Sequence, residues 1–293
     1  MKPEVTIILG PTASGKTNYA IELAKQRPSL IISADSRQVY AGMNIGTAKP
    51  EEAWSSEPHS PMTPDSVQGI DHYLFNVRTP DAPLTLAEWQ SMAQDALRLA
   101  LEHDLHPIIV GGTMLYVDSI VHNYTLPQVA PDQTLRAQLE KEPVEDLYSQ
   151  LIEQDPSAQS FIAPGNKRRI VRALEVIKAT GKPFSTLRAQ QPSLYSFTLI
   201  GLFPGWEELK ERIQTRHAAM FANGLIEETE ELRNRYTPSV PLLATLNYLQ
   251  AGKVLDNTLS LPEAVEENIR VNMRYARRQM SWWRGREEIR WID

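Results

Sequence analysis

The sequence predicts an α/β protein in which a parallel sheet is flanked by helices and interrupted by an all-α insertion. Helical patterns alternate with short, continuous apolar runs, as expected for strands buried between helices: residues 5–9, 30–34 and 107–110. Residues 123–193 carry helical patterns separated by prolines and no strand pattern, which indicates an inserted helical domain. The apolar run at 196–202 then returns the chain to the sheet, so the core is discontinuous and comprises residues 1–122 and 194–293.

An eight-residue glycine-rich run directly follows the first predicted strand. It reads Gly10-Pro-Thr-Ala-Ser-Gly-Lys-Thr17 and fits the pattern G-x-x-x-x-G-K-[ST]. In this pattern, backbone N–H groups surround phosphate oxygens at a helix N-terminus, the lysine neutralises charge and the hydroxyl can hold Mg²⁺. We therefore predict a P-loop NTPase-like core with Thr17 as a metal ligand and the following diphosphate-binding residues: Gly10, Pro11, Thr12, Ala13, Ser14, Gly15, Lys16 and Thr17. A glycine turn without a ligand is the alternative, but it requires neither the lysine nor the threonine.

The other elements follow in order along the chain. Residues 51–68 are rich in Pro and Ser and have no sustained period, so we expect a long surface loop there. Apolar periodicity predicts helices at residues 16–26, 86–102, 131–136, 144–154, 167–179 and 261–283. The acidic run 227–231 is expected to be a helix face in water. The last helix is expected to bury one stripe made of Val265, Ile269, Met273, Ala276 and Met280.

Polar or glycine-rich segments follow three of the predicted strands. These segments begin at Gly10, at Asp35 and at Gly111, which opens Gly111-Gly112-Thr113. Ligands of such sheets collect at the carboxyl ends of the strands. The three segments are therefore expected to meet in one crevice.

Length and composition limit the class of protein. A chain of 293 residues that is 42% hydrophobic can bury a full core. The absence of cysteine excludes disulfides and thiolate zinc sites and is consistent with a reducing compartment. No apolar run approaches the length of a membrane span. We expect a cytoplasmic protein that is not bound to a membrane and acts as a monomer.

Basic residues are concentrated in two stretches of an acidic chain. The net charge is −6, yet residues 166–188 contain seven Lys or Arg and one Glu, and residues 268–290 contain seven Arg and two Glu. Four arginines of the last helix share a face and repel one another unless an anion lies along them: Arg270, Arg274, Arg277 and Arg278. Surface ion pairs, such as one between Glu266 and Arg270, and a solvated charged face remain the alternatives.

A diphosphate cradle beside an aspartate is compatible with two reaction classes. In phosphoryl transfer from ATP, as in a small-molecule or nucleotide kinase, Asp35 holds magnesium or accepts the proton of a hydroxyl. In attack on an activated carbon, Lys16, Thr17 and Mg²⁺ stabilise the departing diphosphate, and Asp35 accepts a proton from the nucleophile. Non-catalytic RNA binding through the basic helices is a third possibility. The residues alone do not choose among these.

Five motifs in series carry a resemblance to a known family. They are the glycine-rich run, Asp35-Ser-Arg-Gln-Val-Tyr40 with Gly42-Met-Asn-Ile-Gly-Thr-Ala-Lys-Pro50, Val110-Gly-Gly-Thr-Met-Leu-Tyr116, Arg169-x-x-Arg-Ala-Leu-Glu175 with Thr180-Gly-Lys-Pro183, and Arg278-Gln-Met-Ser-Trp282. Together they resemble the tRNA dimethylallyltransferase (isopentenyltransferase) family in its bacterial form. The resemblance covers nearly the whole chain.

The resemblance implies that the exocyclic amine of the adenosine 3′ of a tRNA anticodon attacks dimethylallyl diphosphate and releases diphosphate. It implies that Asp35 is the general base, that Thr113 donates to the bridging oxygen of the leaving group, and that Arg216 reaches the same phosphates as Lys16. It also implies that the helical insertion grips the anticodon stem. The tRNA-contacting residues that it implies are Asp35, Ser36, Arg37, Gln38, Thr113, Arg136, Arg168, Arg169, Arg172, Arg274 and Arg278.

Two positions depart from the family pattern, and the loop of residues 51–68 is long for the family. Met114 replaces the usual glycine after Thr113, and Asn247-Tyr248 stands where Gly-Tyr is usual. The departures concern the shape of the prenyl channel and one tRNA contact.

Overall fold

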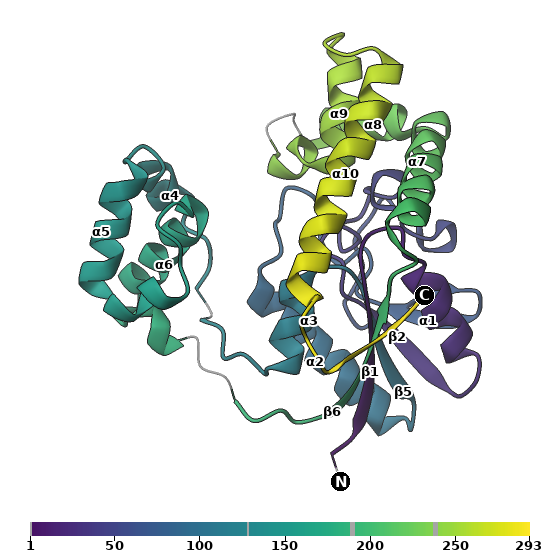
Figure 1. The fold of residues 1–293 in the computed structure, drawn as a ribbon, viewed down its shortest axis with the longest axis horizontal. Coiled ribbons are helices and arrows are strands. Elements are labelled where there is room, and N and C mark those ends of the chain that lie inside the picture. Colours follow the sequence, from purple (N-terminus) through teal and green to yellow (C-terminus); the bar gives the residue numbers. More distant parts are fainter. Residues whose placement is uncertain (1, 128, 188–190, 237–239) are drawn as a thin grey trace. The chain divides into compact units, whose positions relative to one another are not determined.

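A seven-stranded sheet forms the centre of the larger of two units (Figure 1). The strand order is β3-β4-β2-β5-β1-β6-β7, and all neighbours are parallel except the pair β3 and β4. The strands are β1 (Glu4–Leu9), β2 (Ser29–Ser33), β3 (Asp65–Val67), β4 (Ile70–Tyr73), β5 (His106–Val110), β6 (Ser196–Leu202) and β7 (Ile289–Ile292). The predicted α/β fold class is confirmed.

This computed structural model describes residues 2–127, 129–187, 191–236 and 240–293. The chain divides into one unit of Met1–Val121 with Leu194–Asp293 and a second unit of His122–Ser193. No helix in the described ranges has the length and apolar character needed to cross a membrane.

Alternate side chains of the central strands pack against helices on opposite faces of the sheet. Ile8, Ile31 and Ile108 lie in one cluster with the buried side of α1 (Lys16–Ala24). Ile7 and Ile109 belong to the cluster that contains Trp89 of α2 (Leu86–Glu102). Strands covered on both faces have continuous apolar sequences, which is why these runs predicted a buried parallel sheet.

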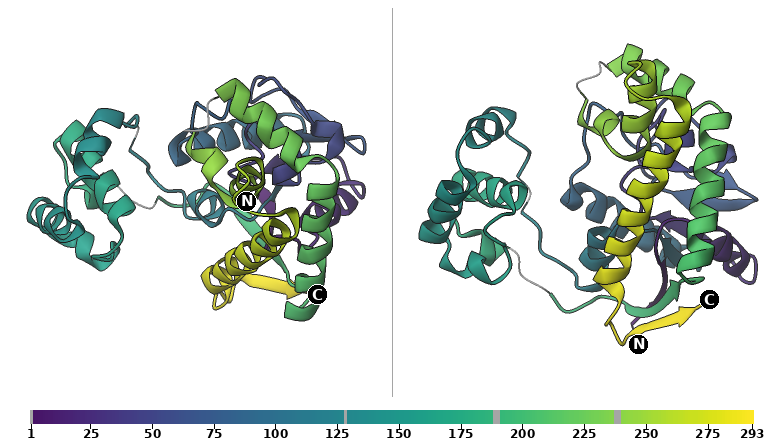
Figure 2. Two further views of the ribbon diagram at one scale, coloured as in Figure 1. Left: turned by 90° about the horizontal axis from the view of Figure 1, so that it is seen from above. Right: turned by 45° about the horizontal axis from the view of Figure 1, so that its top comes forward.

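Helices from the C-terminal half complete the larger unit. They are α7 (Trp206–Ala222), α8 (Leu225–Tyr236), α9 (Leu246–Leu255) and α10 (Leu261–Trp283), and α3 (Met114–Val121) follows β5. Figure 2 shows α7 and α10 side by side, and the two helices are in contact. A capping box of Ser260 and Glu263 begins α10. Trp283, near its end, is completely buried, as expected for a core residue.

The secondary-structure elements of the smaller unit are all helical in the part of the chain that the structure describes. Its elements are α4 (Gln133–Leu139), α5 (Val144–Gln154), α6 (Lys167–Thr180) and two short 3₁₀ turns. Leu147, Leu151 and Ile170 are completely buried in its core, and each such side chain stabilises the unit by ~1.5–3 kcal/mol. Asn166 caps the start of α6, and Gly181, with φ 67°, ends it.

The expected surface loop at residues 51–68 is partly wrong. Asp65–Val67 forms β3, which pairs with β4 in a hairpin that the sequence did not predict. The turn residues Gln68 and Gly69 have φ values of 51° and 78°, as a two-residue type I′ turn requires. The turn was missed because glutamine is an uncommon residue in that conformation. The edge strand β7 was missed as well.

Candidate active site

The three segments predicted to meet do follow neighbouring strands. β5 lies between β1 and β2, so Gly10, Gly111 and Asp35 emerge side by side at the carboxyl edge of the sheet. A cavity of ≈ 160 Å³ opens there, and Lys16, Thr17, Asp35, Gly112 and Arg216 are among its lining residues.

Two glycines shape the P-loop. Gly10 has φ 146°, and a Cβ there would lie 2.4 Å from the carbonyl oxygen of Leu202, so no side chain fits. Gly15 has φ 93° and precedes the first residue of α1. The first N–H groups of α1 have no partner within the helix. The positive end of the helix therefore faces the cavity, as in other anion sites.

Not every residue of the run offers a free donor to a phosphate. Pro11 has no N–H, and its carbonyl oxygen accepts a hydrogen bond from Lys16 Nζ at 2.6 Å. The N–H of Thr12 donates to Gln279 Oε1 of α10 at 2.8 Å. Ser14 N–H donates to the Pro11 carbonyl at 3.3 Å. The backbone donors that stay available belong to Ala13, Gly15 and the first residues of α1 before Tyr19, whose N–H donates to the Gly15 carbonyl oxygen.

The cavity concentrates positive charge. Burial, and next the charge of Arg216, lower the pKa of Lys16 to about 7, while the nearby Asp35 carboxylate acts in the opposite direction. Burial and the charge of Arg212 also lower the pKa of Arg216. An anionic ligand in the cavity would favour the charged forms of both Lys16 and Arg216.

Asp35 and Thr113 are held in defined orientations. Asp35 Oδ1 accepts hydrogen bonds from the N–H groups of Arg37 at 2.8 Å and Gln38 at 3.4 Å. Its other oxygen has no protein donor in the described structure. Thr113 Oγ1 accepts from the Ser36 N–H at 2.9 Å. The Thr113 hydroxyl proton is therefore available to a ligand, and so is one lone-pair-bearing oxygen of Asp35.

The predicted core stripe of α10 is confirmed in part: Ala276 and Met280 are buried, and the other three members pack against the core. Polar residues of the same helix line the cavity, which the sequence did not predict. Val265, Ile269 and Met273 are only partly buried, whereas Asn268, Asn272 and Gln279 are almost completely buried. The amides are tolerated because they have partners, such as the bond from Asn272 Nδ2 to Asn247 Oδ1 at 2.9 Å. Apolar periodicity could not reveal this face.

Several lining residues were not predicted from the sequence. They include His217, Asn247, Asn272, Tyr275 and Gln279. Burial, followed by the charge of Arg216, lowers the pKa of His217 to about 4, so its ring is neutral at pH 7. The sequence held a signal for three of them. His217 follows Arg216 directly, Asn247 departs from the family pattern, and Gln279 lies in the Arg278-Gln motif.

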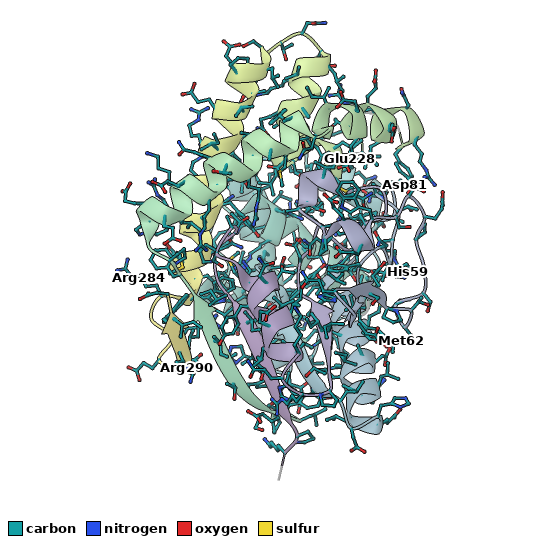
Figure 3. All side chains as sticks on the ribbon, turned by 90° about the vertical axis from the view of Figure 1, so that its right-hand side faces the viewer. His59, Met62, Asp81, Glu228, Arg284 and Arg290 are labelled. Atoms are coloured by element: carbon teal, nitrogen blue, oxygen red, sulfur yellow. The ribbon has the colours of Figure 1, made fainter. Side chains whose placement is uncertain are left out.

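Glu228 is an exception within the acidic run of residues 227–231, whose other glutamates are exposed as expected. Its carboxylate is 9% exposed and accepts hydrogen bonds from the N–H groups of Asn44, Ile45 and Gly46 at 2.8–3.1 Å. Tyr248 Oη donates to it at 2.7 Å. Glu228 (Figure 3) therefore anchors the segment η1 (Ile45–Thr47). The last residue of η1, Thr47, and the next residue, Ala48, line the cavity.

The basic residues of the two units differ in what they contact. On α10, Arg270, Arg274, Arg277 and Arg278 are all exposed, and Arg278 lies 5.8 Å from the ring centre of Tyr275. No ion pair joins Glu266 to Arg270 in the described ranges. An ion pair on this helix instead joins Glu267 to Lys253 of α9 at 2.9 Å, so the alternative of surface ion pairs holds for Glu267.

In the smaller unit, only part of the predicted basic surface is free. Arg168 and Arg169 are exposed. Arg136 and Arg172 instead pair with the carboxylate of Glu175, which is 1% exposed; Arg136 Nε lies 2.8 Å from Glu175 Oε1. Arg136 therefore joins α4 to α6 through Glu175, whereas Arg172 holds Glu175 from the same helix and donates to the Val129 carbonyl oxygen.

Comparison with known proteins gives a consistent result over the whole chain. A model of the IPP transferase family matches residues 38–286, and one described as isopentenyl transferase matches residues 3–56. A tRNA dimethylallyltransferase of Gloeothece citriformis is 41% identical over 293 residues, which cover 100% of this chain and 92% of that protein.

Solved structures agree with this result. The full-length tRNA isopentenylpyrophosphate transferase of Bacillus halodurans is 33% identical with a TM-score of 0.69, and the match covers 100% of this chain and 90% of that one. A eukaryotic dimethylallyltransferase crystallised while acting on tRNA is 23% identical with a TM-score of 0.76, covering 96% of this chain and 70% of that one. The latter likeness concerns the fold.

Proposed function

The chain belongs to the IPP transferase family and is a prenyltransferase that modifies tRNA, and we propose how its residues divide the work. The donor is dimethylallyl diphosphate, and the acceptor is the exocyclic amine of the adenosine 3′ of the anticodon. The nitrogen bonds to the first carbon of the donor, the carbon–oxygen bond breaks, diphosphate leaves and the amine loses one proton. Since the acceptor is tRNA, we expect the reaction in the cytoplasm.

The observation that carries this proposal is the meeting of three segments at adjacent strand ends. The P-loop supplies donors and Lys16 supplies charge for the leaving diphosphate. The Thr113 hydroxyl, whose oxygen already accepts from Ser36, has its proton free for the bridging oxygen. Arg216 lines the same cavity and adds a second cation. These groups stabilise the charge that develops as the carbon–oxygen bond breaks.

Asp35 is the proposed general base. An aromatic amine is a weak nucleophile because its lone pair is delocalised, so removal of its proton as the bond forms lowers the barrier. Asp35 holds one oxygen on backbone N–H groups and leaves the other for that proton. The target base must leave the anticodon-loop stack to reach the cavity, which costs only a few kcal/mol in a loop.

The donor groups also fit a magnesium ion. Thr17 lines the cavity, and within the described ranges no cluster of three or more His, Cys, Asp or Glu is present that would form a metal site made of protein alone. Magnesium keeps several waters and binds through one or two protein oxygens and the phosphates of a substrate. We propose that Thr17 holds Mg²⁺, which when bound would neutralise charge on the diphosphate.

The exposed arginines of both units are the proposed tRNA contacts. Arg274 and Arg278 on α10 and Arg168 and Arg169 on α6 have the exposure that phosphate contacts require. Ser36, Arg37 and Gln38 follow Asp35 directly, so they are placed to contact the nucleotides beside the reacting adenosine.

Replacement of the base tests the proposal. In Asp35→Asn, the two backbone bonds to Oδ1 can be kept while the proton acceptor is lost, so single-turnover transfer of labelled dimethylallyl to tRNA should fall by ~10²-fold or more. The affinity for tRNA, measured by filter binding, should change little. A transfer rate equal to that of the native protein would remove Asp35 from the role of base.

A further inference from the structure

Gln279 reaches from α10 into the two loops that carry the proposed leaving-group contacts. Its side chain is 1% exposed. Its Oε1 accepts a hydrogen bond from the Thr12 N–H at 2.8 Å, and its Nε2 donates to the Gly112 carbonyl oxygen at 2.8 Å. One amide therefore joins the P-loop after β1 to the glycine turn after β5.

The glycine turn is shaped to this amide. A Cβ on residue 112 would lie 2.3 Å from Gln279 Nε2, so only glycine fits while the amide keeps its place. The next residue, Thr113, is held from the other side, because its N–H donates to the Ala34 carbonyl at 3.1 Å and its Oγ1 accepts from Ser36. The turn is thus fixed between the end of β2 and α10.

We infer that Gln279 is a positioning residue: it sets the separation between the P-loop and the Thr113 hydroxyl so that both contact the same leaving diphosphate. The inference rests on the proposed function, which assigns both segments to that group. Simultaneous contact is a strict requirement, since a misplacement of about 1 Å can cost ~10²-fold in rate. Gln279 need not touch either substrate to have this effect.

Gln279 can hold the two loops only because its side chain is a polar amide. A methionine would fill a similar volume, but it would leave the Thr12 N–H and the Gly112 carbonyl oxygen without their present partner at the cavity wall. Nothing would then hold the two loops at a fixed distance, although the core would stay packed. The loss should appear in the rate rather than in the affinity for tRNA, because the exposed arginines of α10 remain in place.

The first test uses Gln279→Met in the full chain with labelled dimethylallyl diphosphate and tRNA. We expect kcat to fall ~10- to 100-fold while the KM for tRNA stays within about twofold. Gln250→Met is the matched control, because Gln250 is also 1% exposed and lies on α9 away from the cavity lining. It should keep the native kcat.

The second test is a double-mutant cycle between the two contacting residues. Gly112→Ala in the native background should displace the amide and reduce kcat, whereas the same change in Gln279→Ala meets no Nε2 and should cost at least about tenfold less. A native kcat in Gln279→Met, or additive effects in the cycle, would overturn the inference. Those results would leave the proposed function standing, whereas a native protein that transfers no label would overturn both.

Discussion

Lys16 is a buried amine that is also proposed to bind the diphosphate. Its ammonium is desolvated and donates to the Pro11 carbonyl, and burial is the main cause that lowers its pKa to about 7. In the free protein at pH 8 the amine is therefore largely neutral. A diphosphate placed beside it favours the charged form and raises the pKa again.

Donor binding should therefore take up a proton. The relevant pH range lies between the lowered pKa of Lys16, about 7, and its raised pKa in the complex. In this range Lys16 must take up one proton before it can pair with the anion. The contribution of Lys16 to donor affinity therefore weakens as pH rises. Calorimetry with dimethylallyl diphosphate at pH 8, in two buffers of different ionisation enthalpy, should show greater proton uptake for the native protein than for Lys16→Gln. Equal uptake by the two proteins would show that Lys16 is already charged before binding.

The residues that carry chemistry in short local motifs could be predicted from the sequence, and the ones that work through distant partners could not. Lys16 and Asp35 were found because each stands in a fixed local pattern after a strand. Gln279 and Glu228 were not, because their backbone partners are distant in sequence: 267 and 167 residues away for Gln279, and 182 to 184 for Glu228. From sequence alone, polar side chains such as these are expected at the surface, because their buried backbone partners are known only from the fold.

Glu228 joins helix α8 to the segment η1. Three consecutive backbone N–H groups and the Tyr248 hydroxyl converge on this carboxylate. Burial, and next the charge of this carboxylate, raise the pKa of Tyr248 well above its usual value. The segment that it holds carries Thr47 and Ala48 to the cavity wall.

Glu228→Gln should destabilise this arrangement. An amide offers one acceptor oxygen and places an NH₂ group against backbone N–H donors, so at least one buried donor loses its partner. We expect a loss of ~2 kcal/mol in the free energy of unfolding, measured by urea denaturation. Glu231→Gln, an exposed position on the same helix, is the control and should change stability by less than ~0.5 kcal/mol. A loss in Glu228→Gln no larger than in the control would contradict the anchoring role.

Element boundaries show the same division between local and distant causes. The helices α2, α5 and α10 were predicted with the bounds that the structure has, because each combines apolar periodicity with clear end signals. The strands β3, β4 and β7 were missed. Each is only three or four residues long and gains its strand conformation from its neighbour in the sheet.

The whole chain presents basic residues on both of its units, although its net charge is −6. Exposed arginines lie on α6 of one unit and on α10 of the other, where acidic partners are few. Contacts to phosphates release counterions, so each one steepens the dependence of affinity on salt. The proposed division of labour is that α6 holds the anticodon stem and α10 lies near the reacting loop.

Removal of charge from α6 should weaken tRNA binding without slowing the chemistry. For Arg168→Gln with Arg169→Gln, we expect the slope of log affinity against log salt to fall by about 1–2, with kcat at saturating tRNA unchanged. Lys25→Gln with Arg98→Gln removes the same charge from exposed positions just after α1 and on α2 and is the control. An identical slope for both double variants would show that α6 does not contact the phosphates.

The most direct measurement compares the two ligands that a P-loop of this kind can hold. The native protein is incubated with unmodified tRNA and either labelled dimethylallyl diphosphate or ATP labelled on its γ-phosphate, and the label in RNA and in small molecules is followed. We expect that the dimethylallyl group enters tRNA, that diphosphate is released and that excess ATP leaves the rate unchanged. Phosphate transfer from ATP, with no isoprenoid label in the RNA, would contradict the proposed function.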